Sequence, residues 1–181
     1  LTDAEGTTLR EAFEQFGLEP EHIAEAALSP EQLIGYLELH IEQGPVLEER
    51  CLPLGVVTSI AGARRFLIEL EGFAGHAGTV PMALRRDALA GAAELILAVE
   101  SLAKEEDVVA TVGQLKALPG GVNVIPGAVQ LSLDIRSAQD VQRDRALKRI
   151  RERLTDIEQK RGLSSHWRET HTAGAIACTD W

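Results

Sequence analysis

The sequence contains very little cysteine, and this absence narrows the classes of protein that it can encode. Cys51 and Cys178 are the only cysteines among 181 residues, and they belong to no Cys-x-x-Cys motif or repeated spacing. A disulfide framework and a cysteine-based zinc site are therefore not expected. A reducing, cytoplasmic environment suits this composition best.

A net basic charge and long apolar runs are also missing. The formal net charge is −10 and the sequence pI is about 5.0, whereas a nucleic-acid-binding surface would need a basic patch. No apolar run approaches membrane-spanning length, and no basic segment followed by an apolar stretch suggests export. With 45% hydrophobic residues, the composition predicts a soluble globular protein that binds neither nucleic acid nor membrane.

The first part of the chain is acidic and helical in pattern. Residues 8–11 (Thr-Leu-Arg-Glu) resemble a capping box, which predicts a helix that ends near Gly17. Ser-Pro at 29–30 marks a second helix start. The apolar run at 34–41 then predicts a strand.

The chain changes character near Gly55. Apolar residues alternate with polar ones at 66–70 and 129–135, which predicts half-buried strands, and a β-branched run and a final segment predict two more strands at 108–115 and 163–172. Helical spacing of apolar residues predicts helices at about 85–104 and 138–160. The order strand, helix, strand, strand, helix, strand predicts an α+β fold, a ferredoxin-like α-β plait. Two helices would cover one face of a four-stranded, mainly antiparallel sheet, and the other face would meet solvent or a partner.

Two short segments each place one histidine among small or polar residues. The first is Glu-Leu-His-Ile-Glu-Gln-Gly-Pro at 38–45, with His40, and the second is Gly-His-Ala-Gly-Thr-Val-Pro-Met at 75–82, with His76. Such surroundings let backbone and ligand approach closely. Taken alone, however, a histidine such as His40 is more often a structural residue, and one such as His76 is more often a surface-loop residue.

Two further motifs complete the pattern: Gly-Val-Asn-Val-Ile-Pro-Gly at 121–127 and Asp-Ile-Arg-Ser at 134–137. Together with the histidine segments, they resemble the aminoacylase/carboxypeptidase-type metallopeptidase and amidohydrolase superfamily. The resemblance is strongest to its branch of N-carbamoyl-L-amino acid hydrolases, allantoate amidohydrolases and β-ureidopropionases. It covers most of the chain, and it is densest between Tyr36 and Ser137.

The resemblance implies a division of the chain into three parts. Residues 1–54 would be the C-terminal piece of the first part of an α/β catalytic domain. Residues 55–173 would be a lid and dimerisation domain, and residues 174–181 would begin the return to the catalytic domain. Because the chain opens at Leu1 without an initiator methionine, we expect it to be a fragment of a longer enzyme.

The resemblance also implies roles for single residues. His40 would bind metal and Gln43 would contact substrate. His76 would polarise the scissile carbonyl at the partner subunit's site, while Asn123 and Arg136 would bind substrate. The residues by themselves leave other interpretations open: Gln43 is also an ordinary polar strand-end residue, Asn123 is common in turns, and Arg136 is also expected to be solvated or to pair with a residue such as Asp134.

The implied whole enzyme is a metal-dependent amidohydrolase that cleaves a linear C–N bond of N-carbamoyl-L-amino acids or allantoate, and it is a homodimer through the lid. It would hold two divalent metal ions, zinc or manganese, with cobalt or nickel as alternatives. Beyond His40 this sequence shows no further ligand set, so we expect at most a partial metal site and an inactive isolated chain. Two alternatives stay open: an aminoacylase or dipeptidase of the same superfamily, and a non-catalytic dimerisation or binding module.

Overall fold

The computed structural model describes residues 1–178. The chain divides into two compact units, Leu1–Gly55 and Val56–Trp181. The predicted return segment, 174–181, therefore extends beyond the described residues.

The first unit consists of short helical segments that bury no side chain. They are α1 (Leu9–Gln15), the 3₁₀ helices η1 (Pro20–Ala26) and η2 (Pro30–Gln32), and α2 (Val46–Glu49). The capping box is present, because the Thr8 hydroxyl accepts a hydrogen bond from the Glu11 N–H (3.2 Å) and the Glu11 carboxylate accepts one from the Thr8 N–H (2.7 Å). The helix start predicted at Thr8 is thus confirmed.

The strand predicted at 34–41 is wrong. These residues have no regular secondary structure, and Ile34, Leu37 and Leu39 are almost fully exposed. A strand forms only when a neighbouring strand accepts and donates its backbone hydrogen bonds. The described residues offer this segment no such neighbour.

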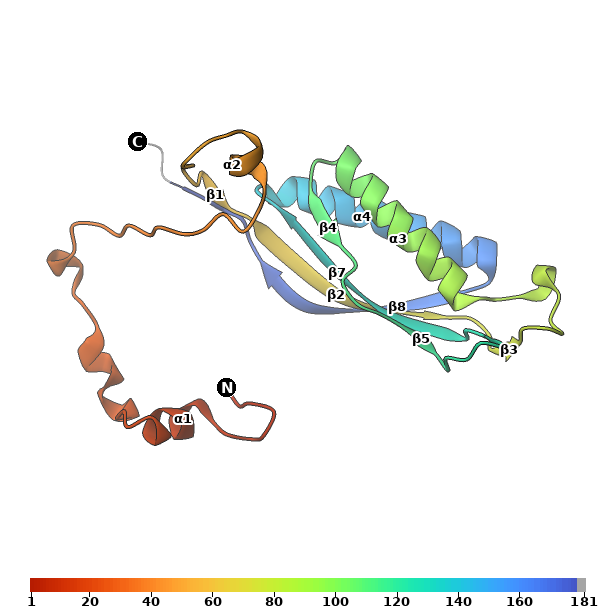
Figure 1. Ribbon diagram of the computed structural model, residues 1–181, viewed down its shortest axis with the longest axis horizontal. Coiled ribbons are helices and arrows are strands. Elements are labelled where there is room, and N and C mark those ends of the chain that lie inside the picture. The colour runs from red at the N-terminus through yellow and green to blue at the C-terminus, as the bar shows by residue number, and fades with distance from the viewer. Residues whose placement is uncertain (179–181) are drawn as a thin grey trace. The chain divides into compact units, whose positions relative to one another are not determined.

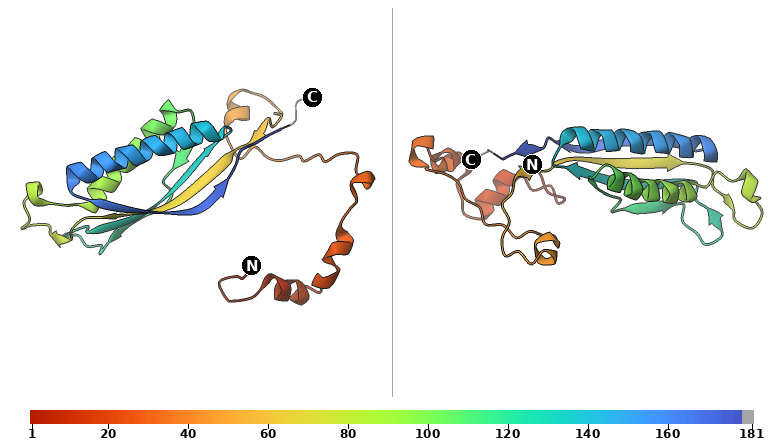
Figure 2. Two further views of the ribbon diagram at one scale, coloured as in Figure 1. Left: turned by 180° about the vertical axis from the view of Figure 1, so that it is seen from behind. Right: turned by 90° about the horizontal axis from the view of Figure 1, so that it is seen from above.

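The second unit contains one main sheet and two long helices (Figure 1). Its elements are β1 (Ser59–Ile60), β2 (Gly62–Glu71), β3 (Gly75–His76), η3 (Met82–Leu84), α3 (Ala88–Glu105), β4 (Val109–Thr111), β5 (Leu115–Leu118), β6 (Val124–Ile125), β7 (Ala128–Ser137), α4 (Asp140–Arg161), β8 (Ser164–Ala173) and β9 (Ile176–Ala177). The strand order is β4-β7-β2-β8, with β5 also paired to β7, and every pair is antiparallel. Both helices lie on the same face of the sheet (Figure 2). The predicted plait is confirmed.

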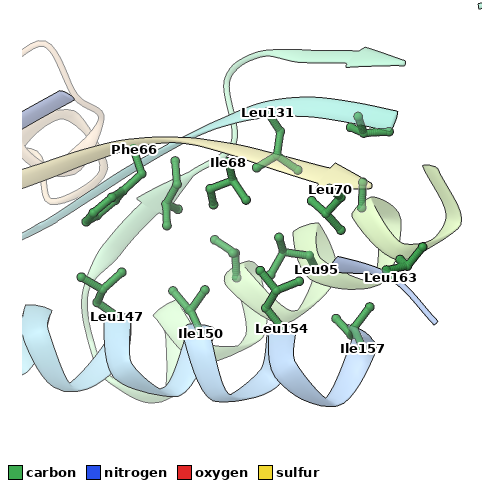
Figure 3. Packing of buried hydrophobic residues seen from close by; sticks show 14 of the residues in the cluster. Phe66, Ile68, Leu70, Leu95, Leu131, Leu147, Ile150, Leu154, Ile157 and Leu163 are labelled. Carbon is green, nitrogen blue, oxygen red and sulfur yellow. The ribbon is translucent and has the colours of Figure 1, made fainter. Parts of the chain in front are cut away.

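Alternation along the two central strands explains why one sheet face is buried. In β2, Phe66, Ile68 and Leu70 are buried, and their neighbours point to the opposite face. Leu95 of α3 and Ile150 of α4 pack against this row of side chains (Figure 3). Burying a large apolar side chain contributes roughly 1.5–3 kcal/mol, so this layer is the main source of the unit's stability.

The edge beside β7 differs from its prediction. The strand predicted at 108–115 is divided into β4 and β5, with a break between them. At the break, the Ser132 hydroxyl accepts a hydrogen bond from the Gln114 N–H (3.0 Å), and the Ser132 N–H donates to the Gln114 carbonyl (3.0 Å). A side chain thus replaces part of the backbone ladder, which a pattern of apolar residues does not reveal.

The end of α4 follows its prediction. Gly162 adopts the left-handed conformation (φ 64°) directly after the helix, which glycine does at little steric cost. The chain then enters β8, whose Trp167 meets Phe66 edge-to-face at 5.5 Å between ring centroids. None of the helices formed by residues 1–178 combines the length and apolar character that crossing a membrane requires.

Candidate functional site

His76 and Asn123 are brought together although they lie far apart in the sequence. β3 pairs with β6 so that His76 is opposite Val124. In addition, the Ala77 N–H donates to the Asn123 carbonyl at 2.9 Å. The glycine-rich loop after β2 and the turn before β7 therefore form one local structure at one end of the sheet.

The ring of His76 is exposed and held by its own loop. The backbone N–H of Gly78 donates to Nδ1 of His76 at 3.0 Å. Because Nδ1 accepts this hydrogen bond, the neutral ring carries its proton on Nε2. Nε2–H is then the donor that the ring can offer to a ligand.

Arg85 stabilises the same loop through two hydrogen bonds to backbone carbonyls. Its Nε donates to the Val80 carbonyl (3.0 Å) and its Nη2 donates to the Ala77 carbonyl (2.6 Å), and the side chain is half-buried. This residue was not predicted, since in the sequence it is only one member of a basic pair. Its position just before the Asp87 cap of α3 is the one local signal that could have indicated it.

Arg136 lies near the other end of β7. It is opposite Ala63 of β2 and Val109 of β4, whereas Asn123 precedes the start of β7 at Ala128. At a rise of about 3.3 Å per residue, Arg136 is roughly 25 Å along the strand from that start. Within one copy of the chain, Arg136 is therefore remote from His76 and Asn123.

The guanidinium of Arg136 forms a two-point contact with Asp134. Nε donates to Oδ1 (2.7 Å) and Nη2 donates to Oδ2 (2.8 Å). Arg65 of β2 donates from Nε to the same Oδ2 (2.8 Å). Hydrogen bonds from Arg136 and Arg65 lower the pKa of Asp134 to about 2, and Asp134 in turn raises the pKa of Arg136. Asp134 is thus the partner that the sequence suggested for Arg136.

His40 and Gln43 both belong to the first unit and are exposed. Nδ1 of His40 lies 2.5 Å from the Ile41 carbonyl, so this nitrogen carries the proton and Nε2 is the one with a free lone pair. Gln43 has a positive φ of 55°, a conformation that costs a non-glycine residue of order 1 kcal/mol and concentrates at functional positions. The carboxylate of Glu42 accepts from the Val46 N–H at 3.0 Å, at the start of α2.

His40 is the residue of this chain that could bind a metal ion, and its surroundings decide whether a complete metal site can form. Nε2 of His40 suits a divalent ion, since the other ring nitrogen is fixed by a backbone carbonyl. Among residues 1–178, however, no three histidine, cysteine, aspartate or glutamate side chains gather closely enough to hold a metal ion. The described part of the chain therefore provides one candidate ligand and not a two-metal centre.

Comparison with known proteins identifies the family of the second unit. The family model of the peptidase dimerisation domain matches residues 58–161. The chain belongs to the peptidase dimerisation domain family. This membership agrees with the dimerisation domain that the resemblance implied.

Individual relatives show which branch of the amidohydrolase superfamily this chain resembles. The chain is 42% identical to an N-carbamoyl-L-amino acid amidohydrolase of Geobacillus stearothermophilus over 98% of this chain and 44% of the relative. It is 38% identical to allantoate deiminase 1 of Glycine max, over 87% of this chain and 37% of the relative. The crystal structure of AtUAH in complex with (S)-hydroxyglycine superposes with a TM-score of 0.75 at 36% identity, covering 97% of this chain and 43% of AtUAH. The family resemblance stated from the sequence is confirmed.

The match covers only part of each relative. This chain spans less than half the length of the relatives that it matches. Family membership therefore establishes the fold and the kinship with amidohydrolases, and the chemistry of the whole protein is a separate question.

Proposed function

We propose that this chain supplies the lid and dimerisation portion of a metal-dependent amidohydrolase. The whole enzyme would hydrolyse a linear C–N bond of an N-carbamoyl-L-amino acid or of allantoate. The observation that carries the proposal is one preformed loop structure, in which His76 pairs with Val124 and the N–H of the next residue, Ala77, donates to the Asn123 carbonyl. The names of the relatives support the substrate class.

His76 would stabilise the reacting carbonyl. Hydrolysis places negative charge on the carbonyl oxygen, and a fixed N–H donor aimed at that oxygen lowers the barrier. The hydrogen bond from Gly78 to Nδ1 leaves Nε2–H as that donor, and Arg85 keeps the loop in shape. Asn123, beside it, would orient the substrate through its amide, which can both donate and accept hydrogen bonds.

Arg136 would bind the substrate's carboxylate, because a guanidinium and a carboxylate match in shape and charge. A small substrate cannot reach both ends of β7. The separation of Arg136 from His76 and Asn123 therefore supports a site shared by two copies, in which one copy gives Arg136 and the other gives His76 and Asn123. This arrangement refines the simpler idea that Asn123 and Arg136 of one copy hold the substrate together.

The homodimer would form along the edge made by β4 with the neighbouring α3. Val109 of β4 and Leu97 of α3 are exposed apolar residues there (68% and 67%), as an interface needs. The opposite edge, β8, carries His166 and Arg168 and faces a β-bulge between Arg65 and Phe66. Charges and bulges are features that discourage edge-to-edge pairing.

Bound divalent metal ions would supply an activated water for the attack. His40 would provide one ligand through Nε2, and Gln43 would contact the ureido or amide group. Since the described residues do not complete a metal site, we expect the isolated chain to release no ammonia and to bind zinc or manganese weakly.

The test is ammonia release from allantoate and several N-carbamoyl-L-amino acids by the whole protein, with zinc or manganese added. The 181-residue chain serves as the control. Turnover by the whole protein alone supports the proposal, and the better substrate identifies the branch. If no ureido substrate is hydrolysed by the whole protein, the proposed function is wrong.

A further inference from the structure

The open face of the main sheet holds a hollow of about 750 Å³ beside the charged cluster of β2 and β7. Arg65, Asp134 and Arg136 all line it. The register explains this gathering, because Arg65 is directly opposite Asp134 and both point to the face that the helices leave uncovered. The bare face can be followed in Figure 2.

Asp134 holds the two arginines close to each other. Nε of Arg65 and Nη2 of Arg136 both lie 2.8 Å from Oδ2 of Asp134, so they are separated by no more than twice that distance. A carboxylate therefore already bridges two guanidinium groups here. A second carboxylate of the same size can repeat this bridge from the solvent side.

Both arginines keep most of their donors for a ligand. A guanidinium has five N–H donors arranged along two usable edges. Asp134 occupies the Nε edge of Arg136 and accepts only one hydrogen bond from Arg65. Among the described residues these are the side-chain hydrogen bonds of the two guanidinium groups, and both arginines line the hollow.

The charges of the cluster favour an anion. Two guanidinium groups face one carboxylate, and the hydrogen bonds that hold the pKa of Asp134 at about 2 keep it ionised at neutral pH. One positive charge is thus left without compensation within the cluster. Val109 and Thr111 border the hollow on the β4 side and give the rest of a small ligand a mixed surface.

We propose that Arg65 and Arg136 together receive the substrate's carboxylate, and that Asp134 is the positioning residue that holds them as a pair. This rests on the proposed function for its substrate, and adds to it a second binding residue and a positioning residue. Arg65 then becomes a determinant of specificity, since it strengthens the preference of the hollow for substrates that carry a carboxylate.

Binding can be measured without turnover. The whole protein, treated with a chelator, is titrated with N-carbamoylglycine in a calorimeter, as wild type and as Arg65→Gln, Arg65→Lys, Asp134→Asn and Asp134→Glu. A charge-assisted hydrogen bond at a partly exposed site corresponds to roughly a ten-fold change in affinity. We expect Arg65→Gln and Asp134→Asn each to weaken binding about ten-fold, and the conservative Arg65→Lys and Asp134→Glu to recover part of the loss.

The matched control is Glu169→Gln. Glu169 accepts two hydrogen bonds from Arg64 (2.8 and 3.0 Å), an arginine–carboxylate pair that involves neither Asp134 nor Arg136. It should leave the affinity unchanged. In turnover assays Arg65→Gln should raise KM for N-carbamoyl amino acids with little change in kcat, because it does not touch the reacting carbonyl.

Three results overturn the inference. The first is a wild type that does not bind N-carbamoylglycine, and the second is wild-type affinity in Arg65→Gln and Asp134→Asn. The third is an equal loss of affinity in the control, Glu169→Gln. If wild type binds N-carbamoylglycine and loses affinity in the variants but hydrolyses no ureido substrate, the carboxylate site stands and the proposed function fails. If wild type hydrolyses a ureido substrate but the variants keep its affinity, the proposed function stands and the carboxylate site fails.

Discussion

The two units of this chain are stabilised by different kinds of interaction. In Leu1–Gly55 the helices α1, η1, η2 and α2 bury no residue, and local capping contacts hold α1. In the second unit, two long helices cover one face of a sheet around a continuous apolar core. The difference teaches that local signals suffice for short helices, whereas strands and the loop that carries His76 need long-range packing.

The largest expected contrast is in stability. Ile150 is fully buried under the sheet, and replacing it with alanine should destabilise the second unit by about 2–5 kcal/mol because a cavity remains. Leu39 of the first unit is 89% exposed, and Leu39→Ala should change stability by less than about 0.5 kcal/mol. Urea unfolding followed by circular dichroism measures the effect of both substitutions, and equal effects would contradict the contrast between the two units.

The next contrast concerns the loop that carries His76. Arg85→Met removes both hydrogen bonds to the loop carbonyls, and a displaced catalytic group costs roughly ten- to a hundred-fold in rate. We expect kcat of the whole protein to fall by this amount, with the unfolding midpoint nearly unchanged. The control is Arg86→Met, which removes only a cation–π contact with Phe73 and should leave kcat intact.

What the sequence predicted, and what it missed, follows the same division. The alternation in β2 and β7 and the stop at Gly162 were readable because each depends on residues adjacent in the chain. The strand expected at 34–41 failed because pairing depends on a partner that no local pattern contains. The contacts of Arg85 with its loop and of Arg65 with Asp134 were also hidden, since they depend on which strands and loops become neighbours. The motifs around His40, Gln43, His76, Asn123 and Arg136 predicted candidates, but not that His76 and Asn123 lie together and apart from Arg136.

Acid should weaken the second unit through two carboxylates. Hydrogen bonds from Arg161 and Lys160 lower the pKa of Glu94 to about 2, from an ordinary 4.5, and the pKa of Asp134 falls to about 2 from 3.8. A depressed pKa gives stability that is present above the ordinary value and lost as the pH falls toward 2. Because both groups are partly solvated, each should contribute only about 0.5–1 kcal/mol.

Unfolding free energies at pH 5 and pH 2 check this window. Glu94→Gln should be less stable than wild type at pH 5, and the gap should close at pH 2, where the wild-type carboxyl is becoming protonated. A gap that stays constant with pH would show that the ion pairs do not act as described.

The most local expected effect is confined to the first unit. Thr8→Ala removes the capping box of α1, which typically costs a helix about 1 kcal/mol. Helicity near Leu9–Gln15, measured by carbon chemical shifts in NMR, should decrease, while the unfolding midpoint of the second unit stays the same. A shift of that midpoint would mean that the two units are energetically linked.

The central claim is that one copy gives His76 and Asn123 and the other gives Arg136, and subunit mixing tests it directly. Whole-protein His76→Ala and Arg136→Ala dimers, each inactive, are mixed and allowed to exchange subunits. By symmetry, half the dimers would be mixed and each would have one intact site, so ammonia release should return to about a quarter of wild type. Mixing His76→Ala with Asn123→Ala should restore nothing, because every site would lack one of the two. Recovery in both mixtures, or in neither, would contradict the shared site.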